Sequence, residues 1–135
     1  MQTVSKNNAI VWGSVAVAIL VNIAGYLWNL YEKIRLFDEI LHAFTTFSLT
    51  LLLAWLLYGV VLKGAEDRSI LFILTVVSLG LAVGALWEIA EWLYDLIVPA
   101  NAILGKTDTI IDLVMDVAGA TVAGILSVGM VKTKA

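Results

Sequence analysis

The chain has 135 residues, enough for one domain. Hydrophobic residues make up 61% of it and charged residues only 14%, which is more apolar than soluble domains are. The absence of cysteine excludes disulfides and thiolate metal ligands. A net charge of −3 without any basic run argues against nucleic-acid binding.

Four apolar stretches, each long enough to cross a bilayer, follow one another along the chain. They cover about residues 9–30, 37–62, 69–98 and 108–131. Backbone polar groups in lipid must be satisfied within each segment. We therefore predict an all-α integral membrane protein, a four-transmembrane-helix up-down bundle that forms a single transmembrane domain over 1–135. A secretory signal is the alternative for the N-terminus, because Lys6 precedes an apolar stretch, but that stretch is too long for one.

The first span follows residues 1–8, which are polar and expected to fray. Asn22 and Asn29 lie seven residues apart, so they share one helix face with Tyr26. Two interpretations remain open for this face: hydrogen bonding between helices, or a polar lining for a site. The segment 31–36 is a charged connection to the second span.

The second span starts near Phe37, with Asp38 and Glu39 in its first turn, where negative charge suits the helix dipole. His42 lies one turn deeper than Asp38. The connection 63–68 is short, so the second and third spans should be antiparallel neighbours.

The third span is long for a membrane helix and ends at Pro99. Its Gly80 and Gly84 form a small-xxx-small pair that allows close helix packing, and Gly119 and Gly124 offer the same in the fourth span. The fourth span starts near Thr107 or Asp108, either of which suits a helix cap.

The charges of the connections predict an orientation. One membrane side, which includes both termini, carries five basic residues, and the other side carries three. The positive-inside rule then places the N- and C-termini in the cytoplasm of a prokaryotic cell. Of the eleven acidic residues, only Glu66 and Asp67 fall on the cytoplasmic side, so the acids gather in the extracytoplasmic half.

These acids occur at helical spacing in three spans that enter this half independently. Antiparallel topology brings the three sets to similar depth, so we expect them to converge. The predicted metal-site residues are Asp38, His42, Glu88, Glu91, Asp95, Asp108, Asp112 and Asp116.

An ionised carboxylate near the bilayer centre costs at least about 2.5–3.5 kcal/mol, so a bound cation, shared protons or water must offset the cluster. Acids at helix ends, namely Asp38, Glu39, Asp95 and Asp108, equally suit a capping or solvated role. The deeper Glu88, Glu91, Asp112 and Asp116 are harder to explain without a site. Carboxylates with one imidazole suit a divalent ion such as Zn²⁺, Mn²⁺, Fe²⁺ or Mg²⁺.

The combination of short motifs resembles the VanZ-like proteins and the related YjdF-type small membrane proteins. The motifs are Asp38-x-x-x-His42, then Glu88-x-x-Glu91 followed by Asp95, then Asp112-x-x-x-Asp116-x-x-Gly119. The strongly acidic set is closer to the YjdF-type pattern. The resemblance covers most of 37–125 and implies a membrane protein of the cell envelope, but no particular reaction.

The leading hypothesis is a metal-dependent hydrolase or transferase that acts on a lipid-linked or phosphorylated envelope substrate. Glu91, as general base, and Asp112 are the candidate catalytic residues. The main alternative is a proton- or cation-coupled transporter, possible mainly as a homo-oligomer, and an architectural role is the third. The cytoplasmic halves of the last three spans are almost wholly apolar apart from Thr75, Ser78 and Ser127, which favours a dead-end pocket.

Overall fold

The chain forms four long helices and one short helix, as a computed structural model describes it for residues 3–58, 69–98 and 102–132. Their bounds are α1 Thr3–Trp28, α2 Leu30–Lys33, α3 Phe37–Leu57, α4 Ser69–Ile97 and α5 Lys106–Lys132. The four long helices are each long and apolar enough to cross a membrane. The predicted all-α membrane architecture is confirmed.

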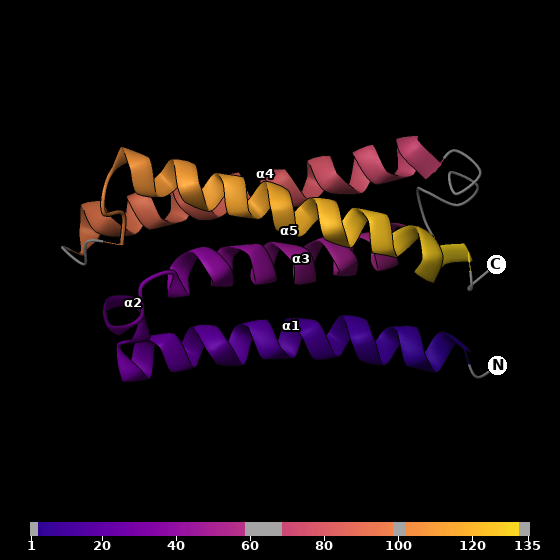
Figure 1. Cartoon of the computed structure of the whole chain (residues 1–135), viewed down its shortest axis with the longest axis horizontal. Coiled ribbons are helices and arrows are strands. Elements are labelled where there is room, and N and C mark those ends of the chain that lie inside the picture. Colours follow the sequence, from indigo (N-terminus) through magenta and orange to yellow (C-terminus); the bar gives the residue numbers. More distant parts are fainter. Residues whose placement is uncertain (1–2, 59–68, 99–101, 133–135) are drawn as a thin grey trace.

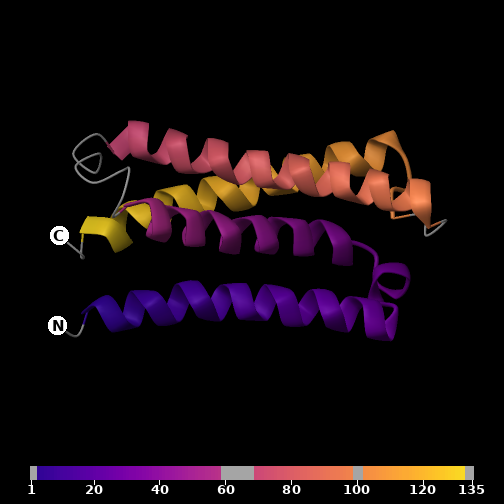
Figure 2. The same cartoon turned by 180° about the vertical axis from the view of Figure 1, so that it is seen from behind.

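The long helices run up and down. The start of α1 and the end of α5 lie at one end of the bundle, and α2 and residues 102–105 lie at the other, which we call the α2 end (Figures 1 and 2). Helix α3 packs against α1, α4 and α5, and both views show it between α1 and the α4–α5 pair. The central helix is therefore the one that carries His42.

The buried side chains are mostly apolar in one part of the bundle and include polar ones towards the α2 end. Away from the α2 end, the core consists of apolar clusters such as Ala54, Phe72 and Val76. Towards the α2 end, the buried side chains include His42, Glu88, Asp112 and Asp116. Large apolar side chains such as Leu27 and Ile70 are exposed on the outside, where a transmembrane bundle meets lipid acyl chains.

The first helix departs from the prediction at both ends. It begins at Thr3, so the expected fraying of residues 1–8 is wrong from that residue on. It ends at Trp28 rather than Leu30, because Asn29 adopts the left-handed conformation that interrupts a helix. The Asn29 side chain donates to Glu32 at 2.7 Å, and the connection expected at 31–36 contains the short helix α2.

The other helix bounds agree with the prediction to within two residues where they are described. Helix α4 ends at Ile97, and α5 begins at Lys106, one residue before the predicted cap. The predicted end of the second span at residue 62 lies outside the described residues. Asp108 lies within α5 and does not cap it. Its carboxylate accepts a hydrogen bond from the Leu104 N–H at 2.9 Å.

Glycine allows the closest approach between α3 and α5. A Cβ at Gly119 would overlap the carbonyl oxygen of Ala43, which is backbone and cannot rotate away. We expect Gly119→Ala to destabilise the protein by about 1–3 kcal/mol, as overpacking does. Thermal unfolding in detergent, followed by circular dichroism, measures this.

The control for this prediction is Gly13→Ala, because a Cβ at Gly13 meets nothing within 4 Å. In an open helix interior, alanine is favoured over glycine by about 0.5–1 kcal/mol. The control should therefore melt at the same temperature as the wild type or higher. Equal melting temperatures for the two variants would contradict the close α3–α5 contact.

Candidate metal centre

His42 lies at the point where α3, α4 and α5 meet. The residue is 6% exposed, and its imidazole faces one carboxylate from each helix. Its Nε2 lies 3.7 Å from Asp38 Oδ1, and its Nδ1 lies 3.7 Å from Glu88 Oε1 and 3.4 Å from Asp116 Oδ1. One acid from each of the three sets that the helical spacing predicted to converge therefore lies beside this imidazole.

Local sequence explains how the α5 carboxylate reaches this point. A Cβ at Gly84 would overlap the Asp116 carboxylate, so only glycine leaves room for it against α4. One turn deeper on α4, a Cβ at Gly80 would overlap Thr50 Oγ1. The predicted small-residue pair thus serves close packing at Gly80 and admits an acidic side chain at Gly84.

Two groups of three side chains offer ligand atoms that lie within 4.8 Å of one another. One group is Asp38, His42 and Asp112, and the other is His42, Glu88 and Glu91. Nitrogen and oxygen ligands lie about 2.0–2.2 Å from a zinc ion, so two of them are at most about 4.4 Å apart. A shift of a few tenths of an ångström would bring either group to that spacing.

Buried polar atoms without hydrogen-bond partners mark the same place. Both carboxylate oxygens of Glu88, Nε2 of His42 and Oδ2 of Asp116 are buried and have no hydrogen-bond partner among the described residues. Leaving such atoms unsatisfied is costly, most of all for a charged group. A bound cation would satisfy them together, so the donor set fits a metal ion.

The charge balance points in the same direction. Five carboxylates surround one imidazole: Asp38, Glu88, Glu91, Asp112 and Asp116. The sequence places no lysine or arginine at 37–57, at 69–97 or at 107–131. The negative charge of the cluster therefore has no basic residue beside it in α3 or α4, and the lysines of α5 are its first and last residues, Lys106 and Lys132.

The two remaining predicted ligands lie elsewhere in the site. Asp95 accepts the backbone N–H groups of Ala102 and Ile103 at 2.8 and 2.9 Å, and Asp108 accepts that of Leu104. Neither belongs to a group of converging ligand atoms in the described chain. Both carboxylates fasten the connection between α4 and α5, and their role as metal ligands stays a prediction.

Thr46 is a site residue that the sequence reasoning missed. Its hydroxyl donates to Asp116 Oδ1 at 2.5 Å, and the residue is buried. The sequence could have indicated part of this role, because Asp38, His42 and Thr46 are spaced four apart and so share one face of α3. Thr46 orients the acid that lies closest to His42.

We expect Thr46→Val to weaken divalent-metal binding by about 10- to 100-fold, the usual cost of losing an outer-shell partner of a ligand. Thr46→Ser keeps the hydroxyl and should retain the affinity. Equilibrium dialysis against Mn²⁺ measures both. The matched control is Thr75→Val, since the Thr75 hydroxyl donates to the Leu71 carbonyl of its own helix. Equal losses in Thr46→Val and Thr75→Val would contradict the assigned role.

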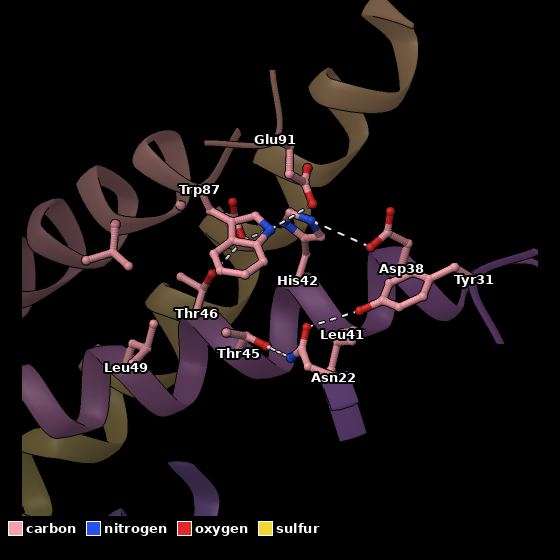
Figure 3. A pocket seen from close by; sticks show the side chains of 13 residues that line it. Asn22, Tyr31, Asp38, Leu41, His42, Thr45, Thr46, Leu49, Trp87 and Glu91 are labelled. Atoms are coloured by element: carbon pink, nitrogen blue, oxygen red, sulfur yellow. Dashed lines mark hydrogen bonds and ion pairs between the residues drawn. The ribbon is translucent and has the colours of Figure 1, made fainter. Parts of the chain in front are cut away.

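A pocket opens beside the cluster (Figure 3). Asn22 and Tyr31 form one wall, and Trp87 and Glu91 form the opposite wall, with His42 between them. The Trp87 Nε1–H donates to Glu91 Oε1 at 2.9 Å. This tryptophan therefore lines the site in addition to contributing to helix packing. Asn22 combines both roles left open for it, because it lines the pocket and also donates to Thr45 Oγ1 across the α1–α3 interface at 3.4 Å.

Comparison with known proteins gives a family. The sequence matches the family described as "Predicted membrane protein (DUF2238)" over residues 4–133. It is 36% identical over 101 residues to an uncharacterised protein of Thermotoga maritima, a match that covers 73% of this chain and 50% of the relative. The chain thus spans about half the length of that relative. No solved structure matches.

Proposed function

The chain belongs to the DUF2238 family of predicted membrane proteins, and we propose that it holds a divalent cation between α3, α4 and α5. We propose further that it uses the cation for hydrolysis or group transfer on a lipid-linked, phosphorylated substrate. The observation that carries the proposal is the buried His42, which lies within 3.7 Å of acids from three helices. The unpartnered oxygens of Glu88 support it independently.

The ligand types restrict the choice of metal. Carboxylate oxygens and a single imidazole suit Zn²⁺, Mn²⁺, Fe²⁺ or Mg²⁺, and no thiolate is present to favour softer ions. His42 belongs to both converging groups, so we assign it as the common ligand. Asp112 is buried and does not line the pocket, which suits a residue that acts through the metal.

Glu91 has the position of a general base. It lines the pocket, is only partly buried, and is held by the Trp87 indole. A bound divalent cation supplies Lewis acidity that polarises a phosphoryl or acyl oxygen and favours deprotonation of water. Glu91 then accepts the proton from the attacking water or hydroxyl group, and Trp87 keeps its carboxylate aimed into the pocket.

The finer family assignment and the location belong to the same proposal. The motifs around His42, Glu91 and Asp116 resemble YjdF-type and VanZ-like proteins, which supports an envelope substrate. The excess of basic residues on one side supports cytoplasmic termini and an extracytoplasmic site. Cysteine-scanning of residues near Lys33 and Lys132 with an impermeant thiol reagent tests the orientation.

Metal content and phosphate release together test the function. The protein is purified with a histidine-free tag, without chelators, and its bound metal is measured by elemental analysis. We expect about one divalent ion per chain, and release of inorganic phosphate from at least one of phosphatidic acid, phosphatidylglycerol phosphate and polyprenyl diphosphate. Chelation should abolish the release, and the readded metal should restore it. Protein without stoichiometric divalent metal would overturn the proposal.

One observation favours a second candidate, a proton- or cation-coupled transporter. Helix α3 buries the hydroxyls of Ser48 and Thr50 deeper than Thr46, and Thr50 Oγ1 has no hydrogen-bond partner. Together with Asp116, these hydroxyls extend the polar face away from the α2 end. Liposomes with an internal pH-sensitive dye distinguish the two, because a transporter dissipates an imposed gradient and a dead-end site does not.

A further inference from the structure

The pocket beside His42 is built across α3, between helices that are not neighbours. Asn22 of α1 and Val83 of α4 both line it, and α3 forms its floor. In both views of the bundle, α1 packs on α3 and lies on the side away from α4 and α5 (Figures 1 and 2). The walls are transmembrane helices, apart from Tyr31 on α2. The pocket therefore borders the region that lipid occupies.

Its lining changes character with depth. Asp38 and Glu91 line it near the α2 end, whereas Leu49 and Val83 line it near the middle of their helices. Asp38 and Leu49 are separated by three helical turns, about 16 Å along α3. One end of the pocket is thus charged and close to the membrane surface. The deep end is mostly apolar, although the Asp116 carboxylate beside Gly84 also lines it. A phospholipid in a bilayer shows the same overall change from charged to apolar.

The wall opposite Glu91 carries two neutral hydrogen-bonding groups, Asn22 and Tyr31. The Tyr31 hydroxyl donates to Asn22 Oδ1 at 3.1 Å, and the Asn22 amide donates to the Ala18 carbonyl at 2.9 Å. Burial, reinforced by the nearby charges of Asp38 and Glu91, raises the pKa of Tyr31 to about 12. Like any phenol, it keeps its proton at neutral pH, and this one O–H would turn from Asn22 Oδ1 to an anionic ligand.

We propose that this pocket binds a lipid phosphate, which enters sideways from the bilayer between α1 and α4. The phosphate lies between the cation at His42 and the Tyr31 hydroxyl, and the first carbons of the lipid chain lie against Leu49 and Val83. The inference rests on the proposed cation site, because the acids alone would repel a phosphate. It adds to the proposed function the route of entry, and it assigns Tyr31 as the residue that recognises the headgroup and Asn22 as the residue that orients the Tyr31 hydroxyl.

The depth of the pocket selects the lipid over free phosphate. Inorganic phosphate has no apolar part to place against Leu49 and Val83 and would have to be dehydrated at bilayer depth. A lipid places its headgroup and the first carbons of its chain in the pocket while the rest of the chain stays in the membrane. The affinity should therefore depend on both the phosphate and the chain.

The test uses the full chain in phosphatidylcholine nanodiscs loaded with Mn²⁺. The probe is phosphatidic acid with a photoactivatable diazirine on one acyl chain. We expect cross-linking near Leu49 and Val83 that requires Mn²⁺, and excess unlabelled phosphatidic acid should suppress it. Tyr31→Phe should reduce the cross-linking about 10-fold, as expected for loss of a hydrogen bond to a charged group, and Asn22→Ala should reduce it as well. Tyr94→Phe is the matched control, because Tyr94 is an exposed phenol that does not line the pocket.

The outcomes separate this inference from the function on which it rests. Stoichiometric Mn²⁺ binding with cross-linking that is indifferent to Mn²⁺ and to Tyr31→Phe overturns the lipid site and leaves the cation site standing. Equal competition by inorganic phosphate and by phosphatidic acid overturns the requirement for a lipid chain. Failure to bind Mn²⁺ overturns the proposed function and this inference together. Folding of each variant is checked by its melting temperature in the same nanodiscs.

Discussion

Replacing His42 with glutamine is expected to abolish stoichiometric binding of divalent metal. His42 is the ligand shared by both converging groups, so among the residues that the structure describes no group of three remains without it. The loss in affinity should exceed the roughly 10- to 100-fold effect of removing an outer-shell partner. Titration of the purified variant with Mn²⁺, monitored by the electron-spin resonance of the free ion, measures it.

The control for His42→Gln is Glu32→Gln, because Glu32 lies on α2 and its carboxylate contacts Asn29 rather than the cluster. Circular dichroism establishes that both variants are helical. Unchanged metal affinity in a folded His42→Gln variant would show that the imidazole is not a ligand. It would leave the buried acids to share protons instead, which is the transporter's chemistry.

Glu91→Gln should remove catalysis and leave the metal in place, held by the group that lacks Glu91, namely Asp38, His42 and Asp112. Glutamine keeps the carbonyl oxygen that accepts the Trp87 N–H, so the side-chain geometry survives while the basic carboxylate is lost. Loss of a general base typically lowers the rate by about 10²- to 10⁴-fold. We expect that fall in kcat for phosphate release, with KM for the lipid phosphate changed little.

The matched control for the catalytic prediction is Glu39→Gln, the same chemical change in the first turn of α3. Glu39 belongs to neither ligand group and does not line the pocket. It should keep the wild-type rate. If Glu91→Gln turns over as fast as Glu39→Gln, the general base is a different residue, and the pocket-lining Asp38 would be the first to test.

The sequence predicts well the features that depend on depth in the membrane and on helical spacing. Hydropathy locates the four spans, and antiparallel topology puts Asp38, Glu88 and Asp112 at one level before any side chain is placed. The deep acids were harder to explain without a site than those at helix ends. Of the helix-end acids, Asp95 and Asp108 accept backbone N–H groups of the connection in the structure, whereas Asp38 lies beside His42.

What the sequence does not predict depends on the rotation of each helix about its axis and on local backbone breaks. Thr46 and Tyr31 are unremarkable in the pattern until α3 is turned towards α5 and α2 is folded back over α1. The break at Asn29 comes from one left-handed residue, which hydropathy does not register. Comparison establishes the broad membrane family, and the closer YjdF-type resemblance and the reaction remain proposals.

The most direct measurement of the central claim uses the fact that His42 is the one histidine in the chain. Protein carrying a histidine-free tag is loaded with one equivalent of Mn²⁺, and electron spin-echo envelope modulation detects nitrogen bound to the ion. We predict a single directly coordinated imidazole nitrogen, which can only be that of His42. Stoichiometric Mn²⁺ surrounded by oxygen ligands alone, or no bound Mn²⁺, would contradict a cation site at the meeting point of α3, α4 and α5.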